Sequence, residues 1–213
     1  MLLVPWSLCI GVLAGSHILA ELKGKKSLTF LTKPLTMVLI IAMMMTWTIQ
    51  GDLSYRNIVL AGLLFSLAGD VFLMQRKEKF IQGLSSFLIA HLFYIYAFTR
   101  GGWVIDGVVA LILLSLAGLF IYFLRNKFGS LFIPVLLYAT AILTMGIVAI
   151  SAWLHQPESA QLAAAVGAVL FIISDGFLAI RKFRGAYKWS PLCVMSTYFC
   201  AQWLIALSAI LKL

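Results

Sequence analysis

The sequence is divided into apolar runs that are each long enough to cross a lipid bilayer. A crossing takes about 20 mainly apolar residues as an α-helix, which satisfies its own backbone hydrogen bonds in lipid. The breaks between the runs are short, which leaves no room for a soluble domain. The runs lie at 2–20, 34–50, 57–75, 81–99, 103–124, 131–153, 160–180 and 190–210. This pattern predicts an all-α integral membrane protein with eight transmembrane helices in one domain, residues 1–213.

The charge balance argues for a membrane and against nucleic acid as a partner. The chain is 63% hydrophobic and 11% charged, and seven acidic residues are too few to solvate a soluble surface of this size. A net charge of +9 could suggest nucleic acid, but Lys and Arg fall in short clusters between the apolar runs. Such clusters orient membrane proteins. We therefore expect membrane lipids as neighbours and no nucleic-acid partner.

The distribution of Lys and Arg predicts the orientation in the membrane. Thirteen of them lie in the first, third, fifth and seventh breaks, whereas the second, fourth and sixth carry only Arg56 and Arg100. Basic loops stay on the cytoplasmic side. Both termini are therefore expected on the other side, in what we interpret as a bacterial cytoplasmic membrane.

An acid within an apolar run occurs twice, in the same local sequence. Asp70 and Asp175 are 105 residues apart. Each is followed by Phe and Leu two and three residues on and by Arg and Lys six and seven residues on, and each is preceded by Gly eight residues before. Because an even number of helices separates the copies, they share one orientation. The sequence predicts two parallel four-helix repeats, roughly 1–102 and 103–213.

Asp70 and Asp175 are the strongest candidates for a functional site. Acids inside a membrane are rare and costly, and they usually face a cavity or a partner. At 1.5 Å per residue, an acid six residues before an arginine lies about 9 Å inside the cytoplasmic boundary. An alternative interpretation is that each acid is structural, bonded to a helix end or to a Lys or Arg. We expect the two acids to form one shared site.

Other polar residues within the runs are candidates for the same site. His91 follows Asp70 in the next helix, where a buried neutral imidazole could orient an acid or move protons, although a helical His is more often a hydrogen-bonded core residue. Tyr94 shares its helix face. Tyr198 and Gln202 are spaced i, i+4 in the last run, and an amide deep in a bundle needs a hydrogen-bond partner.

Basic residues at the predicted cytoplasmic boundary are candidates for phosphate contact. Lys33 and Pro34 are expected to open the second helix, where Pro is allowed in the first turn. For Lys33, an interfacial anchor is as good an interpretation as a phosphate contact. The break that begins at Arg181 is first a topology determinant and second a contact for anionic lipid.

No motif indicates a cofactor. The chain contains no HExxH, CxxC, GxSxG or P-loop pattern, so a metalloprotease, redox or serine-hydrolase mechanism has no support. Asp70, Asp175 and His91 leave a metal possible but not indicated. We expect neither a cofactor nor a metal.

Taken in order, these residues resemble the YhhN-like lysoplasmalogenase family of multi-pass membrane hydrolases. The resemblance covers most of the chain, although the second copy has Gly176 where the first has Val71. It rests on Lys33-Pro34-Leu35, Gly69-Asp70-Val71-Phe72-Leu73, Ala90-His91 with Tyr94, Ser174-Asp175 with Leu178-Ala179 and Phe183, and Tyr198 with Ala201-Gln202.

The resemblance implies hydrolysis of the vinyl ether bond of a lysophospholipid with an ethanolamine or choline headgroup. Protonation of the vinyl β-carbon creates an oxocarbenium ion, and water then adds to give a fatty aldehyde and a glycerophospho-alcohol. One Asp would be the acid and the other the base and cation stabiliser, much as paired carboxylates act in glycosidases. The implied catalytic residues are Asp70, Asp175 and His91, and the implied substrate-binding residues are Lys33, Tyr94, Ser174, Tyr198, Gln202 and Arg181.

Two other classes of protein fit the same residues. A small transporter could use Asp70 and Asp175 for proton coupling in a parallel-repeat fold. A non-catalytic scaffold is the third interpretation.

The predicted orientation can be tested by thiol labelling. In a cysteine-free background, a single cysteine placed near His155 should react with an impermeant reagent from outside, and one placed beside Lys79 should not, because the basic breaks are held inside. Reversed labelling would contradict the orientation and would move the candidate site to the opposite leaflet.

Overall fold

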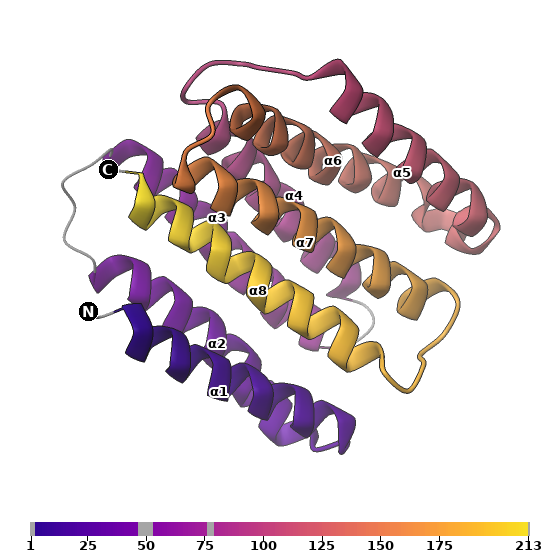
Figure 1. Ribbon diagram of the computed structural model, residues 1–213. Coiled ribbons are helices and arrows are strands. Elements are labelled where there is room, and N and C mark those ends of the chain that lie inside the picture. Colours follow the sequence, from indigo (N-terminus) through magenta and orange to yellow (C-terminus); the bar gives the residue numbers. More distant parts are fainter. Residues whose placement is uncertain (1–2, 47–52, 76–78, 213) are drawn as a thin grey trace.

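A computed structural model describes residues 3–46, 53–75 and 79–212. The described residues form eight α-helices and one 3-10 turn, with no strand among them. The elements are α1 (Leu3–Leu22), α2 (Lys26–Thr46), α3 (Leu53–Met74), α4 (Phe80–Phe98), α5 (Gly107–Phe128), η2 (Gly129–Leu131), α6 (Phe132–His155), α7 (Ser159–Phe183) and α8 (Ser190–Leu211) (Figure 1). Arg76 and Lys77, which follow the first acid, lie outside the described residues.

The helices form a bundle of the kind that spans a membrane. Within the described residues, seven segments are long and apolar enough to cross a bilayer. Six of them are single helices, and the seventh, Gly107–His155, contains α5, η2 and α6. The chain is therefore an all-helical, multi-pass membrane protein. That α5 and α6 each make a crossing, giving eight in two repeats, stays a prediction.

The start of α2 differs from the sequence prediction. Lys33 and Pro34 were expected to open this helix, but α2 begins at Lys26 and Pro34 lies inside it. The prediction was wrong because Pro34 was interpreted as a first-turn residue, although the polar residues before it also adopt helix. As a consequence Lys33 lies about two turns inside α2, and its side chain is buried instead of anchored at the interface.

The start of α5 also differs, by a few residues. The apolar run begins at 103, whereas the helix begins at Gly107. Asp106 sets this boundary, because its side chain accepts hydrogen bonds from the backbone N–H groups of Val108 and Val109, at 2.9 and 3.0 Å. An acceptor at this position satisfies helix N–H groups that have no partner within the helix.

The glycine that precedes each acid lies where two helices approach closely. A Cβ at Gly62 of α3 would collide with the ring of Tyr94 of α4, and one at Gly167 of α7 would lie 2.9 Å from the side chain of Ile205 and 3.1 Å from the carbonyl oxygen of Ala201 of α8. Small residues allow such close packing in membrane bundles. The recurring glycine therefore supports the α3–α4 and α7–α8 contacts.

The close contact at Gly62 predicts the effect of a methyl group there. Gly62→Ala should lower stability by about 1–3 kcal/mol, because the buried Tyr94 ring must shift to make room. The measurement is the midpoint of thermal unfolding in detergent. Gly118→Ala is the matched control, since Gly118 is helical and has no other group within 4 Å of the added carbon. Equal effects of the two substitutions would contradict the packing role.

Candidate active site

Asp70 is fully buried and joins three helices through its carboxylate. Its Oδ1 lies 2.9 Å from the ammonium nitrogen of Lys33 on α2, and its Oδ2 accepts a 2.6 Å hydrogen bond from the hydroxyl of Tyr198 on α8. Lys33 is 7% exposed and Asp70 is 0% exposed. A buried charge is strongly destabilising without its partner. The Lys33–Asp70 ion pair therefore holds α2 against α3, and the hydrogen bond from Tyr198 adds α8.

Asp175 occupies the corresponding place in the second half but has different partners. It is half-buried, and its Oδ2 accepts a hydrogen bond from the hydroxyl of Tyr138 on α6. The same hydroxyl oxygen lies 2.9 Å from Nε2 of His91 on α4. Because Tyr138 gives its one proton to Asp175, His91 must donate from Nε2. A chain of hydrogen bonds therefore runs from His91 through Tyr138 to Asp175.

Both acids line one cavity of about 1300 Å³. All eight helices contribute to its walls. Apart from Tyr138, the lining residues on α5 and α6 are apolar. Charged residues gather where α1 ends, α2 begins and α7 ends; they are Glu21, Lys26, Arg181 and Lys182. The cavity therefore has an apolar body with two acids and a charged mouth.

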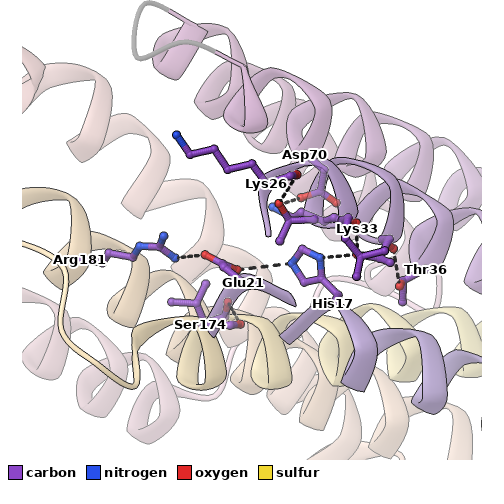
Figure 2. Close-up of polar contacts among 12 residues, drawn as sticks. His17, Glu21, Lys26, Lys33, Thr36, Asp70, Ser174 and Arg181 are labelled. Carbon is purple, nitrogen blue, oxygen red and sulfur yellow. Dashed lines mark hydrogen bonds and ion pairs between the residues drawn. The ribbon is translucent and has the colours of Figure 1, made fainter. Parts of the chain in front are cut away.

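The charged mouth holds a polar network that crosses from α1 to α7, in which Glu21 and Arg181 form an ion pair. Glu21 lies between His17 and Arg181 (Figure 2). Its Oε1 is 2.7 Å from Nη1 of Arg181, and its Oε2 is 3.5 Å from Nε2 of His17. Nδ1 of His17 lies 3.0 Å from the hydroxyl oxygen of Thr32 on α2. This network ties α1 to α2 and α7 beside the cavity.

The remaining predicted residues are divided between the cavity and a separate buried pair. Ser174 lines the cavity, and its hydroxyl donates to the carbonyl oxygen of Val194 at 3.0 Å. Tyr94 and Gln202 are not among the cavity-lining residues; the hydroxyl of Tyr94 donates to Oε1 of Gln202 at 2.9 Å. His91 is also outside the lining and reaches Asp175 only through Tyr138.

Three residues of the site were missed at the level of sequence. Tyr138 lies 105 residues after Lys33, which is the offset between the two acids, so applying the repeat to every polar residue would have found it. His17 and Glu21 carry the weaker signal of an i, i+4 pair at the end of the first apolar run. Within the described ranges, no group of three or more His, Cys, Asp or Glu residues could hold a metal ion.

The fold and the cavity define a multi-pass helical membrane protein in which two acids line one cavity. Residues 28–209 match the YhhN family model, and the chain belongs to the YhhN family, as its resemblance predicted.

Named relatives agree with this assignment. The chain is 37% identical over 161 residues to lysoplasmalogenase TMEM86A of Bos taurus, which covers 71% of this chain and 65% of that protein. It is 29% identical over 164 residues to lysoplasmalogenase TMEM86B of Homo sapiens, covering 77% and 68%. It is 26% identical over 190 residues to the protein named uncharacterized membrane protein YhhN of Escherichia coli O157:H7, covering 89% and 90%. The matched chain thus spans slightly less than two thirds of TMEM86A. No solved structure gives a significant match.

The buried ion pair predicts a pattern of loss and rescue. Lys33→Met should lower stability by about 3–5 kcal/mol, because it leaves the Asp70 carboxylate buried without a counter-charge. Adding Asp70→Asn should restore most of the loss, because the double variant has no buried charge at this place. Thermal unfolding in detergent measures both effects. Lys26→Met is the control and should have little effect, because Lys26 is an exposed residue on the same helix. A double variant that is no more stable than Lys33→Met would contradict the pairing.

Proposed function

We propose that the protein hydrolyses the vinyl ether bond of lysoplasmalogens, releasing a fatty aldehyde and a glycerophospho-alcohol. The observation that carries the proposal is that two intramembrane acids line one cavity large enough for a lipid. The naming of the relatives TMEM86A and TMEM86B as lysoplasmalogenases supports the same activity. These names favour hydrolysis over proton-coupled transport.

The cavity suits an amphipathic lipid whose headgroup lies at the mouth and whose chain lies inside. Its apolar walls, which include Leu116, Phe120 and Ile172, offer a path for the alkenyl chain. Its mouth offers Lys26, Arg181 and Lys182 for a phosphate, which both Arg and Lys bind through charge-assisted hydrogen bonds. The vinyl ether lies between the alkenyl chain and the phosphate of the lipid. In this orientation it would lie near Asp70 and Asp175. Lys33 is less suited to the phosphate because it is paired with Asp70.

The different partners of the two acids support different roles for them. The ammonium of Lys33 and the hydroxyl of Tyr198 both stabilise Asp70 as a carboxylate, which suits a base and a stabiliser of positive charge. Asp175 contacts a neutral phenol and is partly open to the cavity, which suits a proton donor. Two carboxyl groups in different surroundings can thereby divide acid and base work.

The proposed reaction begins with transfer of a proton from Asp175 to the β-carbon of the vinyl ether. The adjacent carbon becomes an oxocarbenium ion, which the Asp70 carboxylate stabilises. Water adds to this carbon and gives a proton to a carboxylate, and the hemiacetal then breaks down to aldehyde and alcohol. Tyr138 would steady Asp175 after it loses its proton, and His91 would orient Tyr138. Tyr138 and His91 are positioning residues in this scheme.

The proposal includes a topology of two parallel repeats with both termini on the non-cytoplasmic side. Asp70 and Asp175 are 105 residues apart, and so are their partners Lys33 and Tyr138. The packing follows the same relation, since α2 lies against α8 as α6 lies against α4, and α3 pairs with α4 as α7 pairs with α8. The start of α1 and the end of α8 lie at the same end of the bundle (Figure 1). These correspondences support eight crossings.

The activity can be tested with an alkenyl lysophospholipid in detergent micelles and a matched alkyl ether as control. The purified protein should release aldehyde from the alkenyl lipid alone, with no ion gradient. Asp175→Asn should lower the rate by at least about a hundredfold, the usual effect of losing a general acid, while keeping the thermal stability. Glu158→Gln, an exposed change at the start of α7, is the matched control.

Two results would contradict the proposal. A folded wild-type protein that releases no aldehyde, yet moves a solute with a proton gradient in liposomes, would favour the transporter. An Asp175→Asn protein that folds and keeps more than about a tenth of the activity, roughly 1.4 kcal/mol in barrier, would exclude Asp175 as donor.

A further inference from the structure

Glu21 has a special position at the mouth of the cavity. Apart from the two Asp residues, it is the only acid among the described residues that line the cavity. It lies between His17 and Arg181, and Arg181 contacts its Oε1 (Figure 2). A carboxylate placed among bases at the expected phosphate site does not help to bind an anion. It is suited to a ligand that carries a positive charge beside its phosphate.

The hydrogen bonds of His17 leave a second acceptor beside Glu21. The hydroxyl of Thr32 donates its proton to the carbonyl oxygen of Leu28 at 2.8 Å, so it must accept from Nδ1–H of His17. In the neutral ring that carries this proton, Nε2 is an acceptor. It is buried, has no hydrogen-bond partner among the described residues, and lies 3.5 Å from Oε2 of Glu21. Two adjacent acceptors of this kind can be bridged by the N–H groups of a ligand.

A primary ammonium group supplies such N–H groups. It carries one positive charge and three N–H bonds, so it can donate to Oε2 of Glu21 and to Nε2 of His17 at the same time. A quaternary ammonium has the same charge but no N–H bond, so it satisfies neither acceptor directionally. The site therefore distinguishes ethanolamine from choline.

Arg181 places the phosphate at a suitable distance from this ammonium site. Its guanidinium has five N–H donors, and its hydrogen bond to Glu21 uses one nitrogen, so the other N–H groups can also bind a phosphate. Arg181 follows Asp175 by six residues, about 9 Å along α7, which separates the phosphate from the reacting bond by a distance suited to the glycerol unit. In phosphoethanolamine, two carbons join the phosphate oxygen to the ammonium, so the two charged groups lie close together. Arg181 and Glu21, which would bind them, are also close together, because they are in direct contact.

We propose that His17 and Glu21 bind the primary ammonium of an ethanolamine headgroup while Arg181 binds its phosphate. The inference rests on the proposed function for its substrate class, and it adds headgroup selection to that function. Ethanolamine lysoplasmalogens are then better substrates than choline lysoplasmalogens. The residues responsible include two on α1, which precedes the part of the chain that the family model matches.

Two measurements on the full-length protein test the headgroup site. The first is kcat/KM for alkenyl lysophosphatidylethanolamine and for the choline lipid with the same chain, which should differ by at least about tenfold in the wild type, the scale of a lost hydrogen bond to a charged group. The second is the rise in unfolding temperature caused by the corresponding alkyl ether lipids, which cannot be hydrolysed. The ethanolamine lipid should cause the larger rise.

Variants of the two acceptors should remove the preference. Glu21→Gln and His17→Phe should each bring the ethanolamine-to-choline ratio close to one in both measurements. Glu158→Gln, the same chemical change far from the cavity, should keep the wild-type ratio.

The outcomes separate this inference from the proposed function. A wild type that treats both headgroups alike in both measurements overturns the headgroup site, and so does a Glu21→Gln protein that loses activity equally on both lipids. A wild type that binds the ethanolamine alkyl lipid preferentially but releases no aldehyde supports the headgroup site and contradicts the hydrolase.

Discussion

The arrangement of the site depends on the buried ion pair between Lys33 and Asp70. Each charge alone would be strongly unfavourable inside the bundle, so α2 and α3 must pack with these two groups in contact. The second carboxylate oxygen accepts from Tyr198, which adds α8 to the same point. The place of the ion pair on the wall of a cavity shared with Asp175 is what gives it a chemical role in the proposed mechanism.

The two halves keep the same acid but use different neighbours. Lys33 in the first half and Tyr138 in the second occupy places 105 residues apart, and each contacts the acid of its own half. A cation beside one carboxyl group and a phenol beside the other make the two acids chemically unequal. In the proposed two-repeat arrangement, the two halves would in this way supply one acid and one base. In the proposed binding mode, the headgroup of the lipid lies at the charged mouth formed by Glu21 and Arg181.

Much of the fold could be predicted from the sequence, because spanning helices need long apolar runs and intramembrane acids are rare. The partners of the acids could not, because they come from other helices and depend on packing. Lys33 was expected at the membrane interface, as an anchor or a phosphate contact, because Pro34 resembled a helix start, although the helix begins at Lys26. Tyr138 has no local signal, and Tyr94 pairs with Gln202 instead of reaching the cavity. The only sequence signal for Tyr138 is its position 105 residues after Lys33, the same offset that separates the two acids.

The central claim is that an acid in this cavity protonates the β-carbon of a vinyl ether. Its most direct test is to let the wild-type protein act on an alkenyl lysophospholipid in D₂O, reduce the released aldehyde at once, and locate deuterium by mass spectrometry. Protonation by an acid fixed in the cavity delivers deuterium to one face of the carbon next to the former carbonyl, so chiral analysis should find a single enantiomer of the deuterated alcohol. An alcohol deuterated equally on both faces would contradict protonation in the cavity, and the absence of aldehyde would contradict the activity itself.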